Sequence, residues 1–313
     1  MKRLLLGLGL TAAVLAGSAF GLATRSAGPP ILAGCPVFPA SNVWNQPVNT
    51  LPVAADSAQL IASIGLTASV HADFGSGLYD GQSIGIPYIV VNGKTTPKSR
   101  VKFDYADESD KGPYPIPSNV PIEGYPNPGN GDRHAIIVDR STCKLYELYA
   151  LRHAGSGWAA GSGAIWNLRS NALRPAGWTS ADAAGLPILP GLALWPEVAA
   201  GQIDHALRFT ASQTRNTYIY PARHEASSSS DPSLPPMGLR VRLKAGVDIS
   251  KLPPQARIVA QAMKTYGLIL ADNGSPWYIS GAPNAHWSND QLHALGALNG
   301  SDFEVVDTSK LRP

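Results

Sequence analysis

Charged side chains are scarce in this sequence of 313 residues: Asp, Glu, Lys and Arg make up 15%, against about a quarter in typical globular domains. The formal net charge is only +3, and no segment concentrates the basic residues. Proteins that bind nucleic acids need a concentrated basic surface, so we expect no nucleic-acid partner. Hydrophobic residues make up 44% of the chain, which is enough to fill a core.

The N-terminus carries an apolar run without a charge, at residues 4–20. Lys2 and Arg3 precede this run, and small residues at 21 and 23 follow it. This order is typical of a secretory signal peptide, which we predict at residues 1–23, followed by a disordered segment at 24–34. The run is marginal for a membrane-spanning helix, so we expect a secreted, extracellular protein without a membrane span. Removal of the signal peptide lowers the net charge from +3 to +1.

Cysteine is almost absent, since Cys35 and Cys143 are the only two in the sequence. An exported chain meets an oxidising compartment, so we predict a disulfide between them. The alternative is a lipid anchor on Cys35, because Leu32-Ala33-Gly34-Cys35 resembles the lipobox of bacterial lipoproteins. Arg25 and two prolines separate this motif from the apolar run, which favours the disulfide.

Short runs of β-branched and aromatic residues, bounded by Gly, Pro or Asp, predict strands along most of the chain. They lie at residues 86–91, 101–105, 134–139, 144–151, 205–210, 217–220, 239–244 and 303–306. One clear helix is predicted at 253–266, with weaker candidates at 57–64 and 290–298. Parallel α/β folds need about as many helices as strands, so we exclude them. We predict a mainly-β single domain over residues 35–313, an antiparallel β-sandwich or jelly roll.

Three motifs of known enzyme classes lack an essential part. Residues 81–85 match the G-x-S-x-G pattern of serine hydrolases, but a strand follows where a helix is required. His224-Glu225 has no second histidine four residues after the first, as zinc proteases require. Residues 136–147 resemble the opening strands of an L,D-transpeptidase, but no cysteine follows Cys143 to act as its nucleophile.

An acidic cluster follows the predicted strand at 101–105. Oxygen ligands at such spacing are able to hold calcium, although the pattern differs from an EF-hand loop. The alternative is a solvated acidic turn, and we expect no other cofactor. The cluster consists of Asp104, Asp107, Glu108 and Asp110.

Asp132 and His134 open another predicted strand. Residues two apart in a strand share a face, so these side chains could form a metal pair or an acid–base pair. The alternative is a turn aspartate beside a structural histidine. Glu147 lies in the middle of the next predicted strand and is a candidate catalytic acid, because glycosidases use carboxylates on open β-sheet faces.

A further constellation fits eliminative cleavage of a uronate polymer, in which cations neutralise the carboxylate and His or Tyr moves the proton. The predicted catalytic residues are His205, Arg208, Tyr218 and Tyr220, with Arg240 and Arg242 binding substrate.

Three short segments of the chain resemble motifs of the jelly-roll alginate lyases. They are Glu147 in a Leu-Tyr-Glu-Leu-Tyr strand, residues 202–205 and residues 243–247. The sequence departs from that pattern: an extra residue precedes His205, and Asp248 stands where a tyrosine is expected. This resemblance implies a β-sandwich fold.

A broader likeness covers residues 131–149, 173–182 and 205–210, which resemble a family of uncharacterised secreted bacterial proteins. Trp166 and Trp178 lie in a Gly/Ser/Asn-rich segment, where indoles are able to stack on sugar rings. We therefore expect a monomeric protein that acts on extracellular or cell-wall polysaccharide, by lyase or glycoside hydrolase chemistry. The alternative is a non-catalytic carbohydrate-binding or cell-envelope protein.

Overall fold

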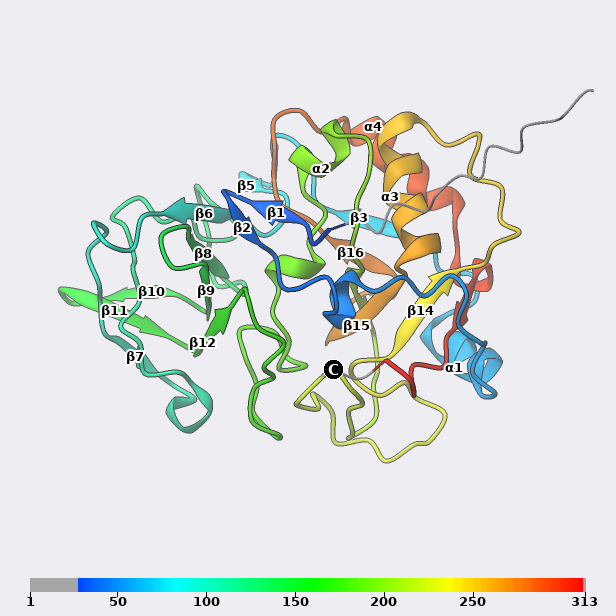
Figure 1. Cartoon of the computed structure of the whole chain (residues 1–313), viewed down its shortest axis with the longest axis horizontal. Coiled ribbons are helices and arrows are strands. Elements are labelled where there is room, and N and C mark those ends of the chain that lie inside the picture. Colours follow the sequence, from blue (N-terminus) through cyan, green and yellow to red (C-terminus); the bar gives the residue numbers. More distant parts are fainter. Residues whose placement is uncertain (1–27, 312–313) are drawn as a thin grey trace, which may run out of the picture.

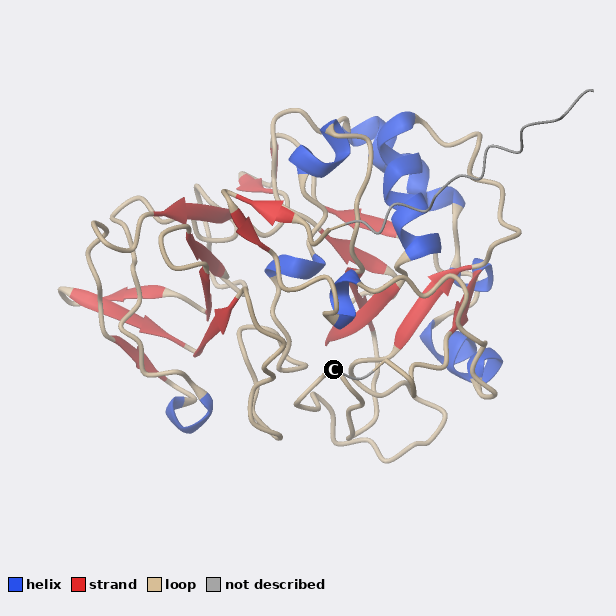
Figure 2. Ribbon diagram, viewed as in Figure 1, coloured by secondary structure: helices blue, strands red, loops and turns tan. Residues whose placement is uncertain are grey.

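A computed structural model describes residues 28–311, which form two groups of strands side by side (Figure 1). The predicted signal peptide lies outside the described residues. Helices gather around one group, whereas the other consists almost wholly of strands and loops (Figure 2). The helices are α1 (Ser57–Ile64), α2 (Trp195–Ala199), α3 (Pro254–Thr265) and α4 (Asn289–His293), with short 3-10 turns η1 (Val43–Asn45), η2 (Ala106–Glu108), η3 (Leu189–Gly191), η4 (Ala294–Ala297) and η5 (Gly300–Asp302).

The larger sheet has six strands, with α3 and α4 nearby (Figure 1). Its order is β17 (Phe303–Val305), β14 (Arg240–Leu243), β15 (Leu268–Asn273), β13 (Leu207–Ala211), β16 (Tyr278–Ser280) and β3 (His71–Asp73). β13 pairs with β15 in parallel and with β16 antiparallel, so the sheet is mixed.

The second main sheet has four strands, in the order β12 (Ser162–Asn167), β9 (Lys144–Tyr149), β8 (Ala135–Asp139) and β6 (Tyr88–Val91). β6 and β8 are parallel, and the other two pairs are antiparallel. A three-stranded sheet lies beside it, made of β10 (Arg152–Ala154), β11 (Gly157–Ala160) and β7 (Val101–Phe103). Two small hairpins complete the strands: β1 (Ile31–Leu32) with β2 (Cys35–Pro36), and β4 (Leu78–Tyr79) with β5 (Gln82–Ser83).

The mainly-β prediction is confirmed, and all three predicted helices form near their expected residues. The finer prediction of an antiparallel β-sandwich or jelly roll is not confirmed, because both main sheets contain parallel pairs. Parallel neighbours need long crossover connections, which are usually helices. The connection from β6 to β8 contains β7, η2 and loops but no α-helix, so counting helices missed this parallel pair. The predicted strand at 217–220 is also corrected, because Tyr218 makes only an isolated bridge to Met237.

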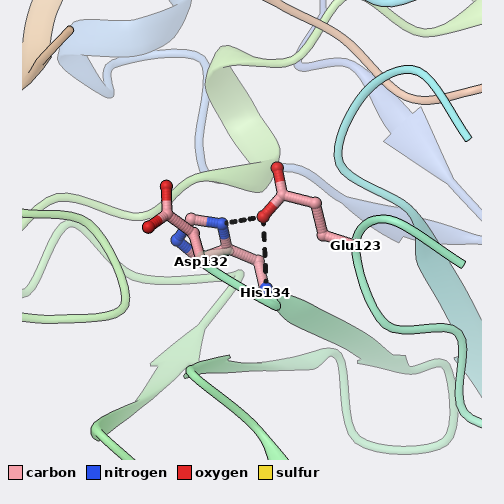
Figure 3. Close-up of side chains that lie close together, drawn as sticks. All are labelled: Glu123, Asp132 and His134. Atoms are coloured by element: carbon pink, nitrogen blue, oxygen red, sulfur yellow. Dashed lines mark hydrogen bonds and ion pairs between the residues drawn. The ribbon is translucent and has the colours of Figure 1, made fainter. Parts of the chain in front are cut away.

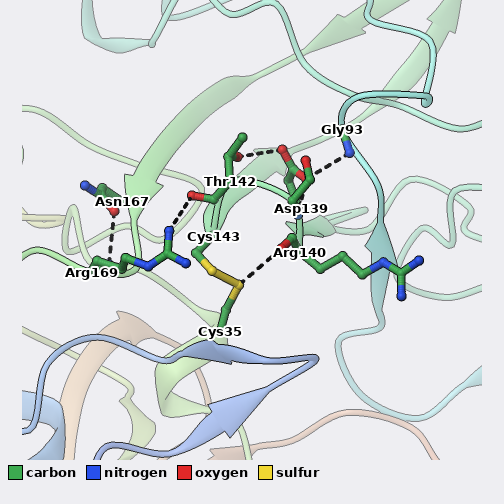
Figure 4. The surroundings of a disulfide bond; sticks show 9 residues. Cys35, Gly93, Asp139, Arg140, Thr142, Cys143, Asn167 and Arg169 are labelled. Atoms are coloured by element: carbon green, nitrogen blue, oxygen red, sulfur yellow. Dashed lines mark hydrogen bonds between the residues drawn. A yellow bond between two sulfur atoms is a disulfide. The ribbon is translucent and has the colours of Figure 1, made fainter.

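A disulfide joins Cys35 to Cys143, as predicted (Figure 4). It links the β1–β2 hairpin to the turn between β8 and β9, and the two cysteines are 108 residues apart in the chain. Because both sulfur atoms are consumed by this bond, a lipid anchor on Cys35 is excluded. The bond is consistent with an extracellular protein. No described helix has the length and apolarity to cross a membrane.

One large hydrophobic cluster contains residues of both main sheets, including Ile136 and Leu145 from one and Phe209 and Leu270 from the other. All four side chains are fully buried. The two sheets therefore pack against a shared apolar core.

Candidate functional site

Polar side chains follow one another across four neighbouring strands of the six-stranded sheet. Asp73 ends β3, Ser280 ends β16, Arg208 lies in β13 and Asp272 lies in β15. Asp73 and Ser280 are register partners, and Arg208 donates a hydrogen bond of 2.6 Å from Nη1 to the Ser280 hydroxyl. Adjacent strands are about 4.8 Å apart, so this polar row runs across the sheet rather than along one strand.

A β-bulge places Asp272 in this row. Phe209 is paired with Leu270, but the next residue, Thr210, is paired with Asp272, so Ala271 has no partner in β13. Without the extra residue, Asp272 would share the face of Leu270, because residues two apart point the same way. The bulge moves Asp272 onto the face of Thr210 and Arg208, and bulges often re-aim side chains in this way beside active sites.

Arg208 forms a buried ion pair with Asp182. Its Nη2 lies 3.0 Å from Asp182 Oδ1 and its Nε lies 3.3 Å from Oδ2. The exposed fractions of the two side chains are 5% and 0%. Burial raises the pKa of Asp182, and Arg208 opposes that shift. Because both side chains are buried, loss of either one would leave the other charge in the interior without a counter-ion.

Asp272 differs from Asp182 because its carboxyl group reaches a cavity. Its Oδ2 lies 3.8 Å from Arg208 Nη2, and 28% of its side chain is exposed. Burial raises the pKa of Asp272 to about 6, the nearby Asp182 carboxylate adds to this, and Arg208 opposes it. A carboxyl group with such a pKa is able to carry a proton near neutral pH and donate it.

Facing this row, Glu123, Asp132 and His134 form a second polar cluster (Figure 3). His134 Nδ1 lies 2.6 Å from Glu123 Oε2, and its Nε2 lies 3.0 Å from the Ala181 carbonyl oxygen. Burial disfavours the charged imidazole, but the Glu123 carboxylate outweighs this and raises the pKa of His134 to about 9. Sequence analysis predicted a paired use of Asp132 and His134, and the structure brings them together while adding Glu123.

Two cavities meet at Asp132, which lines both. The larger, of about 560 Å³, is bounded by Asp73, Glu123, Tyr79 and Tyr278 among others. The smaller, of about 360 Å³, is bounded by His134, Asp182, Asp272, Tyr105 and Tyr149 among others. Volumes of roughly 300–1,000 Å³ are typical of ligand sites, so either cavity is large enough for a small ligand or one unit of a polymer.

Exposed aromatic rings border these cavities. Tyr79 is 74% exposed beside the larger cavity, and Tyr105 is 54% exposed beside the smaller one. His71 and Tyr278 stack with their ring centroids 4.2 Å apart in the wall of the larger cavity. Flat rings at a polar cavity suit sugar rings, whose apolar faces stack on aromatics while their hydroxyl groups bind polar side chains.

Glu147 does not serve as an accessible catalytic acid. The residue is fully buried, and its carboxylate accepts hydrogen bonds of 2.9–3.0 Å from the backbone N–H groups of Ile188 and Leu189. Burial raises its pKa to about 7, and these backbone donors oppose the shift. The prediction assumed that β9 has an open face, but the segment around η3 covers that face and uses Glu147 as an internal anchor.

The predicted lyase residues do not assemble. His205 is buried, with Nε2 3.1 Å from Glu197 Oε1 and Nδ1 2.7 Å from the Ala206 carbonyl oxygen. Arg208 belongs to the polar row. Tyr218 and Tyr220 are half-buried against the core and line neither of the two cavities. The expected set is corrected because 217–220 does not extend the sheet next to β13.

Arg240 and Arg242 bind the protein's own backbone rather than facing solvent. Arg240 donates to the carbonyl oxygens of Val43, Gln46 and Tyr266, and Arg242 donates to that of Val48 and pairs with Glu304 at 2.8 Å. Strand alternation placed both on one face correctly, but the N-terminal segment covers that face. Their predicted role in substrate binding is corrected accordingly.

Trp166 and Trp178 both lie against the guanidinium group of Arg174. Its guanidinium group lies 5.7 Å from the ring centroid of Trp166 and 5.4 Å from that of Trp178. Trp166 is also buried in the core, so it is not available to a sugar, and Trp178 is half-buried. The exposed aromatic rings at the cavities are instead Tyr79 and Tyr105, which sequence analysis did not single out.

The carboxylates of the proposed calcium cluster mostly have other partners. Asp104 pairs with Arg152 at 3.1 Å, Asp110 pairs with Arg174 at 2.6 Å, and Glu108 accepts from the Thr179 backbone N–H at 2.8 Å. Asp107 is exposed on η2. Within residues 28–311, the one convergent group of three His, Cys, Asp or Glu side chains is Glu123, Asp132 and His134.

Sequence analysis missed four carboxylates of the site: Asp73, Glu123, Asp182 and Asp272. Asp272 had a signal, because it directly follows the apolar run Leu268-Ile269-Leu270-Ala271, which is typical of a buried strand. Glu123 lies in a proline-rich loop, and no local pattern places it beside His134.

The fold and site define a mainly-β protein with a carboxylate-rich pair of cavities between two sheets. Comparisons with protein-family models, curated proteins and solved structures gave no match to this chain.

Proposed function

We propose that this protein is exported and hydrolyses glycosidic bonds of an extracellular or cell-wall polysaccharide in the cavities that meet at Asp132. The signal-peptide pattern at residues 1–23 and the disulfide support export. The observation that carries the catalytic part is Asp272, a partly exposed carboxyl group with a raised pKa that shares a cavity with a second carboxylate, Asp132.

Glycoside hydrolysis needs one carboxyl group that protonates the leaving oxygen and another polar group that directs the attack on the sugar carbon. Asp272 supplies the proton, and Arg208 Nη2 on the neighbouring strand lies 3.8 Å from its carboxyl group. Asp132 enters the same cavity from the loop before β8 and positions the attacking water. Because the His205, Tyr218 and Tyr220 set does not assemble, hydrolysis is favoured over eliminative cleavage.

The binding of a sugar chain is supported by the exposed Tyr79 and Tyr105 at the two cavities. A chain whose units stack on both rings would pass over Asp132, which lies in the wall of each cavity. Neutral or weakly charged glycans fit best, since carboxylates in these walls repel acidic polymers.

The test is a panel of polysaccharides assayed for new reducing ends and for absorbance at about 235 nm, which only eliminative cleavage produces. We expect new reducing ends from at least one glycan without the absorbance change. Asp272→Asn should lower this rate by about 10²- to 10⁴-fold, because the amide cannot donate the proton. Asp56→Asn, an exposed aspartate that lines neither cavity, is the control and should keep the wild-type rate.

A second candidate is a non-catalytic carbohydrate-binding protein, favoured by the exposure of Tyr79, Tyr105 and Tyr125. Retention on an insoluble glycan without any product would support it. In that case Tyr79→Ala should weaken retention, whereas Asp272→Asn should leave retention unchanged.

A further inference from the structure

The cluster of Glu123, Asp132 and His134 has the composition of a metal site. Each residue places one possible ligand atom within 4.8 Å of the ligand atoms of the other two (Figure 3). The cluster lies where the cavities meet, and Asp132 is exposed to solvent. An ion held there would keep open coordination positions, as catalytic rather than structural metal sites do.

The imidazole of His134 is oriented as a metal ligand requires. Its Nε2 lies 3.0 Å from the Ala181 carbonyl oxygen, which only accepts, so Nε2 carries a hydrogen. Nδ1 faces the carboxylates and lies 2.6 Å from Glu123 Oε2, so a cation bound there would replace the proton that the two groups share. Metal-bound histidines commonly donate their other ring N–H to a backbone carbonyl, which fixes the ring.

The His134 backbone N–H donates to Glu123 Oε2 at 3.3 Å, and two further backbone hydrogen bonds hold the cluster without using the ligand atoms. The Glu123 N–H donates to the His134 carbonyl oxygen at 2.9 Å, which joins the two segments. The Ala150 N–H donates to the Asp132 carbonyl oxygen at 2.8 Å. The His134 side chain is buried, and the residue lies directly before β8. The backbone positions of the three residues are therefore fixed by hydrogen bonds.

We propose that Glu123, Asp132 and His134 bind one divalent transition-metal ion of the Zn²⁺ or Mn²⁺ class. One imidazole nitrogen with two carboxylate oxygens suits these ions, whose bonds to such ligands are about 2.0–2.2 Å long. Calcium takes six to eight oxygen ligands and is disfavoured by the nitrogen. The inference rests on these three side chains and does not require that the protein cleaves a glycan.

Calorimetric titration of the purified, EDTA-treated exported protein with ZnCl₂ tests the proposal. We expect one Zn²⁺ per chain for the wild type, and weaker binding or none for CaCl₂. Asp132→Asn and His134→Ala should each lower the affinity for Zn²⁺ by at least about tenfold. The matched control is His224→Ala, which removes an imidazole from the wall of the same cavity outside the cluster and should keep the wild-type affinity.

His134 is buried, so circular dichroism must show that its variant is folded, and Asp132→Asn at an exposed side chain gives the same test without that risk. The proposal is overturned if the folded wild type does not bind Zn²⁺ at one ion per chain. It is equally overturned if Asp132→Asn binds like the wild type, or if His224→Ala weakens binding as much as His134→Ala. Because no glycan enters this titration, failure here is distinct from failure of the proposed hydrolysis.

Discussion

Asp272 Oδ2 lies 3.8 Å from Arg208 Nη2, on a face of the sheet that Asp272 reaches only through the bulge after Phe209. The contact is loose compared with that between Arg208 and Asp182, which are 3.0 Å apart. Arg208 therefore neutralises Asp182 and only partly stabilises the charge of Asp272. In the proposed mechanism, the two aspartates beside this arginine therefore have different roles, Asp182 as a structural counter-ion and Asp272 as a proton donor.

The rate of glycan hydrolysis should fall as the pH rises through about 6. Asp272 acts only when protonated, and its pKa is raised to about 6, so the active form disappears above that value. The measurement is the pH dependence of kcat/KM, which reports groups of the free enzyme. A profile that is flat from about one pH unit below this pKa to about two units above it would contradict the role given to Asp272.

Removal of Arg208 should destabilise the fold strongly. Arg208→Met leaves the buried Asp182 without its counter-ion, and we expect a loss of about 3–5 kcal/mol in the free energy of unfolding. The double variant Arg208→Met with Asp182→Leu should recover much of this loss, because no buried charge remains. Urea denaturation measures both values.

The control for this experiment is Arg152→Met, because Arg152 and Asp104 form an ion pair whose side chains are 43% and 57% exposed. Exposed pairs contribute about 0–1 kcal/mol, so this variant should unfold almost like the wild type. Equal effects of the two arginine substitutions would argue against a buried, interdependent pair of Arg208 and Asp182.

Glu147 should make the protein less stable as the pH rises. Its pKa is raised from 4.5 in the unfolded chain to about 7 in the folded protein, so its contribution is complete below pH 4.5 and is lost toward pH 7. The loss is on the order of 3 kcal/mol. Glu147→Gln removes this titrating group. The free energy of unfolding should therefore decrease less between pH 4.5 and pH 7 in the variant than in the wild type, by the contribution of about one ionisation.

Comparison of the two proteins by urea denaturation at several pH values isolates Glu147 from other titrating groups. Identical pH dependence of the wild type and the variant would show that folding does not raise the pKa of Glu147.

Loss of the disulfide should lower stability by up to about 4–5 kcal/mol, because the bond joins residues 108 positions apart and restricts the unfolded chain. The double variant Cys35→Ser with Cys143→Ser and the reduced wild type should unfold at similar urea concentrations. If the oxidised wild type unfolds there too, the bond does not stabilise the fold.

Local patterns were sufficient for much of the secondary structure. The helix at 253–266 was recognisable from its apolar stripe and from Gly267, whose φ of 71° ends α3. Strands 134–139 and 144–151 were recognisable from β-branched and aromatic residues between turns. The run at 268–273 was overlooked although it forms the centre of the larger sheet, because a short continuous apolar run has neither the period of a helix nor that of an exposed strand.

The sequence by itself determined that a cysteine pair was available for a disulfide and that strands dominate, because each depends on composition or on near neighbours in the chain. Only the tertiary structure decided which polar residues meet. Glu123 and Asp272 lie in segments far from each other in sequence, and strand register, a one-residue bulge and loop packing bring them to adjoining cavities. The same packing buried Glu147 and Arg240 and covered most of the Arg242 side chain, because a covered sheet face and an open one carry the same alternating pattern until something is known to lie above them.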